Sequence, residues 1–186
     1  MTALIIAAAA AGLVLWSVVR SNSRFAHERE AIAISWSNVE TELRRRHDLV
    51  PRLVDTVRGY AAHERPMLDA VMLACAAAVG TEGLPATKVD AENQLVAGIR
   101  QLLAMSDAYP DLRAANHFLE LQDQLAMTEK RIHASQRLYN SEVRAFNGRV
   151  ESIPSSLVAW AFRHRLAESF ELDPLTRGTD AHATRL

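Results

Sequence analysis

Apolar residues recur every three or four positions along most of the chain, and polar residues occupy the positions between them. This spacing is typical of amphipathic helices, and no strand-like alternation interrupts it. The first stripe has four members spaced by seven: Trp36, Leu43, Val50 and Val57. It keeps its phase across Pro51, although proline removes a helical N–H and crowds the preceding turn. We therefore expect a kinked helix there; a break that starts a new helix at Pro51 is the alternative.

Two shorter helices are predicted to follow. The run HERP at residues 63–66 marks the end of the first helix, and Pro66 suits the first turn of the next one. The second helix is expected at about residues 66–79 and the third at about residues 88–108. Between them GTEGLPA, residues 80–86, has the composition of a loop.

The longest signal is a heptad series in the second half of the chain, formed by Phe118, Leu125, Ile132, Tyr139, Phe146 and Ile153. It predicts one helix from Asp111 to Ser152, about 42 residues and roughly 63 Å long. Thr128 and Ser135 fall at core positions, where small polar residues allow helices to approach closely. The pattern as a whole predicts an all-α fold, an antiparallel bundle of about four long helices.

The chain after Pro154 contains a short amphipathic segment and a tail without apolar periodicity. SSLVAWAFRHR, residues 155–165, is a short amphipathic segment in which Trp160 stands near basic residues. It would cover the open end of the bundle core, or lie at a membrane surface, where Trp and Arg suit the boundary between lipid and water, and the two can coexist. The tail DPLTRGTDAHATRL, residues 173–186, has no apolar period and is predicted to be disordered.

The beginning of the chain indicates a membrane anchor. TALIIAAAAAGLVLWSVV, residues 2–19, holds 18 residues without a charge. At roughly 1.5 Å per residue this run spans about 27 Å, enough for the hydrocarbon core of a bilayer. A cleaved signal peptide is the competing interpretation, but no Lys or Arg precedes the run. Arg20, Arg24 and Arg29 follow it, so the positive-inside rule places the short N-terminus outside and the body in the cytosol.

Composition adds two constraints. The 186 residues include 21 basic and 22 acidic side chains, for a net charge of −1, so nothing favours a nucleic-acid partner. Cys75 is the single cysteine, which excludes an internal disulfide and fits a reducing compartment. Its surroundings, MLACAAAV, favour a buried small apolar residue over a nucleophile.

The stretch LRRRHDLVPRLVDTVRGYAAHE, residues 43–64, gathers the candidates for a chemical site, namely His47, Asp48 and His63. On a continuous helix His47 and His63 point about 160° apart, so they cannot share a metal ion unless the helix is strongly kinked. The consecutive arginines at residues 44–46 fan around the helix, and we interpret them as a solvated cluster.

Two further pairs, His117-x-x-Glu120 and Glu129-x-x-x-His133, differ from the Glu-x-x-His motif of di-iron bundles and are interpreted as surface pairs. The sequence also lacks a Gly-rich phosphate loop, Gly-x-Ser-x-Gly and a cysteine pair for zinc. We therefore predict no catalytic residue, no metal site and no cofactor, and we do not expect an enzyme.

Two blocks of the chain resemble the LemA family. The first is SWSNVETELRRRHDLVPRLVDTVRGYAAHE, and the second runs from ENQLVAGIRQ to ESIPSSLVA and includes AYPDL. The resemblance covers about residues 35–170, and its motifs are specific in combination. It implies a bacterial protein with one N-terminal membrane helix, a short N-terminus outside and a helical-bundle body. No catalytic residues come with the resemblance.

The leading hypothesis is a scaffold or adaptor anchored in the bacterial inner membrane that acts through protein or lipid contacts. Residues 1–20 would be the anchor, touching the bilayer through residues 2–19, and residues 21–172 would be the cytoplasmic body. The alternative is a membrane-attached enzyme or metal-binding protein with a site near Pro51. Self-association through the apolar second helix is compatible with the first hypothesis.

Overall fold

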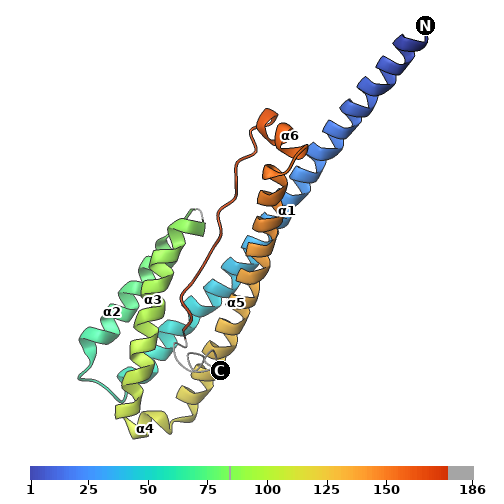
Figure 1. Cartoon of the computed structure of the whole chain (residues 1–186). Coiled ribbons are helices and arrows are strands. Elements are labelled where there is room, and N and C mark those ends of the chain that lie inside the picture. Colours follow the sequence, from blue (N-terminus) through green and yellow to red (C-terminus); the bar gives the residue numbers. More distant parts are fainter. Residues whose placement is uncertain (84, 176–186) are drawn as a thin grey trace, which may run out of the picture. The chain divides into compact units, whose positions relative to one another are not determined.

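The computed structural model describes residues 1–83 and 85–175, except the side chains of residues 3–8, 10, 11, 14 and 15. The elements in this part of the chain are α1 (Thr2–Arg58), α2 (Arg65–Gly80), α3 (Pro85–Met105), the 3-10 turn η1 (Ser106–Ala108), α4 (Pro110–Arg113), α5 (Asn116–Glu151) and α6 (Ser155–Ala161) (Figure 1). All of them are helical, so the all-α prediction is confirmed for the described residues.

The chain divides into two compact units, and both α1 and α5 contribute to each. Unit 1 contains residues 1–37 and 137–169, and unit 2 contains residues 38–136 and 170–186. Pro51 lies inside α1, which continues as one helix to Arg58. The alternative of a break at Pro51 was therefore wrong, and the continuous apolar stripe was the correct guide.

Unit 2 is a helical bundle whose core comes from all of its helices. Its fully buried side chains include Val54 and Val57 of α1, Leu68 of α2, Leu95 and Ile99 of α3, and Phe118 of α5. The helices α2 and α3 pack closely: a Cβ atom at Gly98 would lie 3.3 Å from Cγ2 of Val71. Thr128 is buried and donates to the carbonyl of Gln124, as the heptad pattern predicted.

Unit 1 pairs α1 with α5 in antiparallel fashion. Phe25 meets Phe146 with ring centroids 5.9 Å apart, and Trp36 meets Tyr139 at 5.4 Å. Tyr139 and Phe146 are almost completely buried, which confirms them as core residues of the long helix. The ion pair between Arg149 Nε and Glu28 Oε1, at 2.6 Å, joins the same two helices.

The long helix is shorter than predicted at its N-terminal end. The sequence placed its start at Asp111, but Pro110–Arg113 form the separate helix α4, and α5 begins at Asn116. This turn lets Leu112 and Phe118 both point into the core, where each is fully buried. At the other end Ile153 lies beyond α5 and is 86% exposed, so the heptad series ends one member early.

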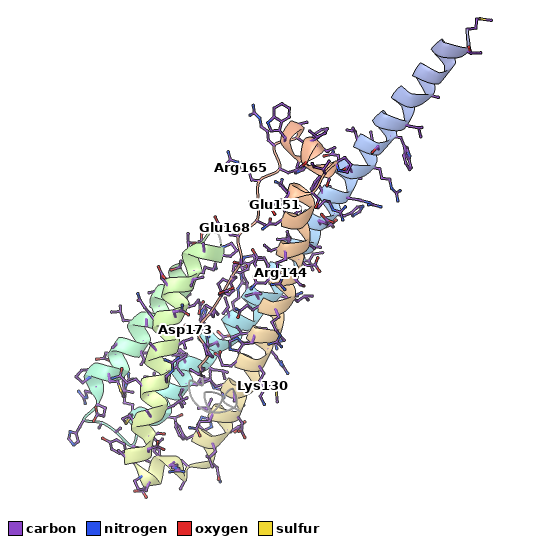
Figure 2. The ribbon with its side chains drawn as sticks, viewed as in Figure 1. Lys130, Arg144, Glu151, Arg165, Glu168 and Asp173 are labelled. Carbon is purple, nitrogen blue, oxygen red and sulfur yellow. The ribbon has the colours of Figure 1, made fainter. Side chains whose placement is uncertain are left out.

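The segment after α6 is extended and hydrogen-bonded. In unit 1, Asn147 donates to the carbonyl of Ala167 at 2.9 Å and accepts from its N–H at 2.8 Å. Figure 2 shows Arg165 and Glu168 along this segment.

In unit 2, Asn93 accepts from the N–H of Asp173, and Arg100 donates to the carbonyls of Pro174 and Leu175. Residues 173–175, assigned by the sequence to the disordered tail, therefore pack against α3. Residues 176–186 lie outside the described part of the chain.

The predicted anchor, residues 2–19, forms the first part of α1. Ten of the side chains on which that prediction depends, those of residues 3–8, 10, 11, 14 and 15, lie outside the described part of the chain. Among the residues that were described, none of the helices combines the length and apolar character needed to cross a membrane. The anchor therefore stays a prediction.

Candidate functional site

The most unusual feature of unit 2 is an arginine in its core. Arg46 of α1 is completely buried. The sequence interpretation of residues 44–46 as a solvated cluster was wrong for this member. Position 46 lies three residues after Leu43 and four before Val50, which are both buried, so its side chain shares the inward face of the helix.

Two buried carboxylates from other helices meet this arginine. Nη1 of Arg46 donates to Oε1 of Glu129 on α5 at 2.9 Å, and Nη2 donates to Oε2 of Glu92 on α3. The side chains of Glu92 and Glu129 are 2% and 8% exposed, so all three charges are removed from water. The interpretation of Glu129 and His133 as a surface pair was therefore wrong. Arg46 instead joins α1, α3 and α5 through charge-assisted hydrogen bonds.

His47 completes the cluster from the edge. Its Nε2 lies 2.9 Å from Oε1 of Glu92, an oxygen that accepts when the carboxyl is ionised. Burial by itself would raise the pKa of Glu92, but the hydrogen bonds and the positive charges of His47 and Arg46 outweigh burial, so the pKa is lowered. Glu92 is thus held as an anion inside the bundle.

Cys75 of α2 lies close to the backbone of His47. It is buried, as predicted, and its Sγ lies 3.8 Å from the carbonyl oxygen of His47. Pro51 cannot donate to that carbonyl, so the thiol approaches a group that the proline leaves free. Burial raises the pKa of the Cys75 thiol, and the negative charge of Glu92 raises it further. The protonated thiol is a poor nucleophile.

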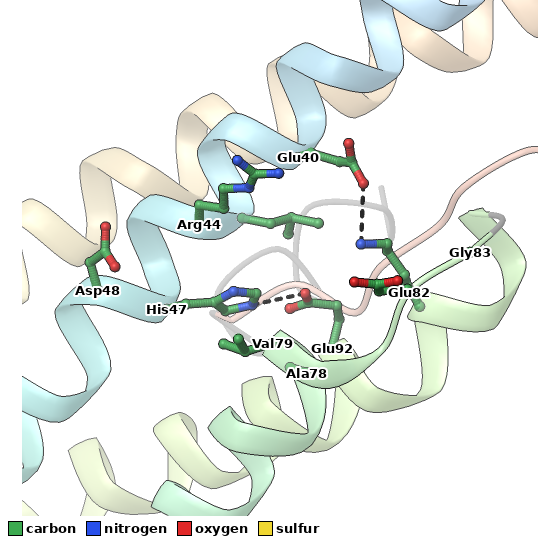
Figure 3. Close-up of a pocket in the computed structure, with 11 residues that line it drawn as sticks. Glu40, Arg44, His47, Asp48, Ala78, Val79, Glu82, Gly83 and Glu92 are labelled. Carbon is green, nitrogen blue, oxygen red and sulfur yellow. Dashed lines mark hydrogen bonds and ion pairs between the residues drawn. The ribbon is translucent and has the colours of Figure 1, made fainter.

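A pocket of about 550 Å³ opens beside the cluster, and Figure 3 shows His47 and Glu92 directed toward each other within it. Lys88 and Glu40 form an ion pair of 3.1 Å at its edge. The lining residues are Glu40, Leu43, Arg44, His47, Asp48, Ala78, Val79, Glu82, Gly83, Lys88 and Glu92. The lining mixes both signs of charge, and Glu92 and Lys88 already have partners within the protein.

The three candidates of the Pro51 region do not form a site. His47 binds Glu92, Asp48 is exposed at the pocket edge, and His63 is exposed in the turn after α1. His117 and Glu120 are both exposed on α5. Within residues 1–83 and 85–175 no group of three His, Cys, Asp or Glu side chains is arranged to hold a metal ion.

Sequence reasoning missed Arg46, Glu92 and Glu129, although a signal was present. Each of the three occupies a core position in its helix: Glu92 precedes buried Leu95 by three residues, and Glu129 precedes buried Ile132 by three. Charged residues at core positions are rarely left unpaired, so three of them with opposite signs predict a buried cluster.

In its described residues the protein is thus an all-helical bundle with a buried ion cluster. The LemA family model matches residues 35–181, which is most of the chain, and this protein belongs to the LemA family. It is also similar to Protein LemA of the bacterium Metamycoplasma hominis, with 21% identity over 148 residues that cover 80% of this chain and 68% of that protein.

Proposed function

We propose that this LemA family protein is a membrane-anchored helical scaffold that works through contacts with proteins and lipid. The observation that carries the proposal is the continuity of α1, one helix of 57 residues. Its first part is the uncharged run at residues 2–19, and its last part supplies Val54 and Val57 to the core of unit 2. A membrane segment and a core helix would thus be the same element.

The ion cluster supports a structural role for the body. The guanidinium of Arg46 is taken up by Glu92 and Glu129, and Glu92 also bonds His47. The charged ends of these side chains are paired within the protein, so their geometry suits the fixing of helix positions better than proton transfer to a substrate. For the alternative of a metal-binding protein, the described residues around Pro51 include no group of three His, Cys, Asp or Glu side chains placed to hold a metal ion.

Attachment to the membrane is the first test. The full chain, expressed in a bacterium, should remain in the membrane pellet after alkaline carbonate washing and should be released by detergent. The same chain without residues 2–19 should be found in the supernatant. Full extraction of the intact chain by carbonate would show that the anchor is wrong.

Orientation needs a second measurement. In a Cys75→Ala background, a membrane-impermeant maleimide should label Thr2→Cys in intact cells, because the N-terminus is proposed to lie outside. It should label Glu82→Cys, in the loop between α2 and α3, only after the cells are opened. The reverse pattern would place the body on the outer side and contradict the cytoplasmic proposal.

Self-association through α2 fits the same function. Leu73 and Val79 are 73% and 60% exposed, so α2 has apolar side chains available for a contact. Sedimentation of the detergent-solubilised full chain should give more than one copy, and Leu73→Lys should lower that number. A monomer at every concentration would remove self-association from the proposal.

A further inference from the structure

A groove in unit 1 combines apolar walls with uncompensated positive charge. It encloses about 600 Å³ between the early part of α1 and α6. Its lining contains three arginines and no carboxylate, and the residues are Leu13, Trp16, Ser17, Val18, Arg20, Ser21, Arg24, Arg149, Pro154, Ser155, Leu157 and Val158.

The three arginines differ in what they bind. Arg149 is paired with Glu28, and Arg20 lies over the ring of Trp16 with its guanidinium carbon 5.5 Å from the ring centroid. Neither Arg20 nor Arg24 has a carboxylate within ion-pair distance in the described part of the chain, and both are exposed. The groove therefore presents two positive charges that an anion can neutralise.

The helix α6 adds large apolar side chains beside this charge. Leu157 and Trp160 of α6 are 68% and 83% exposed, and Phe162, which follows the helix, is 51% exposed, while Ala159 packs against Phe25 and Phe146. The left-handed residue Arg163, with φ of 54°, ends α6 and is followed by a second exposed arginine, Arg165. An exposed tryptophan near arginines suits the boundary between lipid and water, where the ring contacts acyl chains and the charges contact headgroups.

The position of the groove along the chain also indicates a ligand of the lipid–water boundary. Leu13, Trp16 and Val18 of its lining belong to the uncharged run at residues 2–19, and Arg20 follows directly. An element that leaves a bilayer passes through the headgroup layer at this place. The occupant with a negative headgroup and apolar tails that matches both kinds of lining is an anionic phospholipid.

We propose that the groove between α1 and α6 binds an anionic phospholipid at the membrane surface. Arg20 and Arg24 contact the phosphate, and the apolar residues of α6 lie among the upper acyl chains. The proposal rests on the membrane anchoring proposed above and adds the lipid class and the site. Of the two sequence interpretations of residues 155–165, which can coexist, it develops the contact with the membrane surface.

The test of the lipid class uses the full chain in nanodiscs of phosphatidylcholine mixed with phosphatidylglycerol. Native mass spectrometry should find phosphatidylglycerol enriched among the retained lipids. Arg20→Gln with Arg24→Gln should lower this enrichment at least about fivefold. Arg52→Gln with Arg137→Gln, two exposed arginines outside the groove, removes the same charge and should leave it unchanged. Equal enrichment in all three proteins, or none, overturns the proposal.

A second experiment reports the depth of α6 and separates the two proposals. In a Cys75→Ala background, a nitroxide at Ala161→Cys should collide with oxygen more than with a water-soluble nickel complex. A label at exposed Glu120→Cys serves as the water reference. If the chain resists carbonate extraction but the Ala161 label is in water and no lipid preference is found, only the groove proposal fails. If carbonate releases the chain, the anchor itself is wrong.

Discussion

At the scale of single residues, the buried ion cluster of unit 2 is the feature on which the stability of the fold should depend most. Arg46 is fully buried among three helices, and its charge is balanced by Glu92 and Glu129. Its Nε is buried and has no hydrogen-bond partner among the described residues, so the cluster is not fully satisfied. Removal of one member leaves charges without partners in the core, which costs more than the net stabilisation of the intact cluster.

Arg46→Met should therefore destabilise the fold by about 3–5 kcal/mol, because two buried carboxylates lose their cation. The matched control is Arg45→Met, since the Arg45 side chain is 50% exposed and forms an ion pair with Glu42 on its own helix. The control should change stability by less than about 0.5 kcal/mol. Urea unfolding of the solubilised chain measures both, and equal small effects would contradict a structural role for Arg46.

The apolar version of the cluster gives a separate prediction. Arg46→Met combined with Glu92→Leu and Glu129→Leu removes all three buried charges together. This triple variant should recover most of the stability that Arg46→Met loses, because no unpaired charge stays in the core. A triple variant as unstable as the single one would show that packing around the three side chains, and not their charge, holds the helices.

Acid should weaken the cluster through Glu92. Its pKa in the folded protein lies below the ordinary value of 4.5, so its contribution to stability is present above pH 4.5 and is lost as the pH falls through the folded pKa. Glu92→Gln should make the stability fall less steeply below pH 4.5 than in the unaltered protein. Exposed Glu120→Gln is the control, and an unchanged slope in both variants would contradict this assignment.

At the scale of elements, α1 and α5 are the two helices that contribute to both units. The helix α1 tolerates Pro51 because its apolar stripe is buried on both sides, with Val50 and Leu53 nearly inaccessible. The helix α5 supplies Tyr139 to unit 1, and the Tyr139 hydroxyl donates to the carbonyl of Glu168 at 2.7 Å. Packing thus outweighs the unfavourable Pro51 in α1. The hydrogen bond from Tyr139 of α5 holds the extended segment that follows α6.

Replacement of Pro51 by alanine should stabilise the protein, by up to about 3 kcal/mol, since it restores an N–H for the carbonyl of His47 within a helix interior. Pro66 stands in the first turn of α2, where proline is favourable, so Pro66→Ala should give no such gain. Thermal unfolding followed by circular dichroism compares the two. A loss of stability in Pro51→Ala would mean that the bundle requires the proline at this position.

Tyr139 allows the packing and hydrogen-bonding contributions to be separated. Tyr139→Ala should cost about 3–5 kcal/mol, as for other buried aromatic residues. Tyr139→Phe keeps the ring beside Trp36 and loses the bond to Glu168, so it should cost only about 0.5–1.5 kcal/mol. The thermal midpoints should fall in that order, and equal losses would show that the ring contributes little.

For the whole molecule, the expected function depends on the first part of α1. A charged residue at the centre of a membrane helix costs about 2.5–3.5 kcal/mol on insertion, so Ala9→Arg should lower the fraction of the chain retained in membranes. Ala26→Arg places the same charge on an exposed position beyond the run and should leave retention unchanged. Equal retention of both variants after carbonate washing would contradict the anchor.

The sequence by itself determined the helices, because helical periodicity depends on residues three and four positions apart. It placed α2 and α3 within a few residues, and it identified Tyr139 and Phe146 as core residues. The separate helix α4 was not predicted, since the turn after Arg113 depends on how Leu112 and Phe118 both reach the core.

Only the tertiary structure decided which charges are buried. Arg46 meets Glu92 and Glu129, which lie 46 and 83 residues away along the chain, and no local pattern specifies such partners. Of the three consecutive arginines, only Arg46 lies in phase with the apolar stripe, and the bundle surrounds it and leaves Arg44 and Arg45 exposed. The same holds for α6, where local amphipathicity did not show that Ala159 is buried while Leu157 and Trp160 are exposed. Burial is a property of assembled helices, so the charge cluster and the groove exist only in the fold.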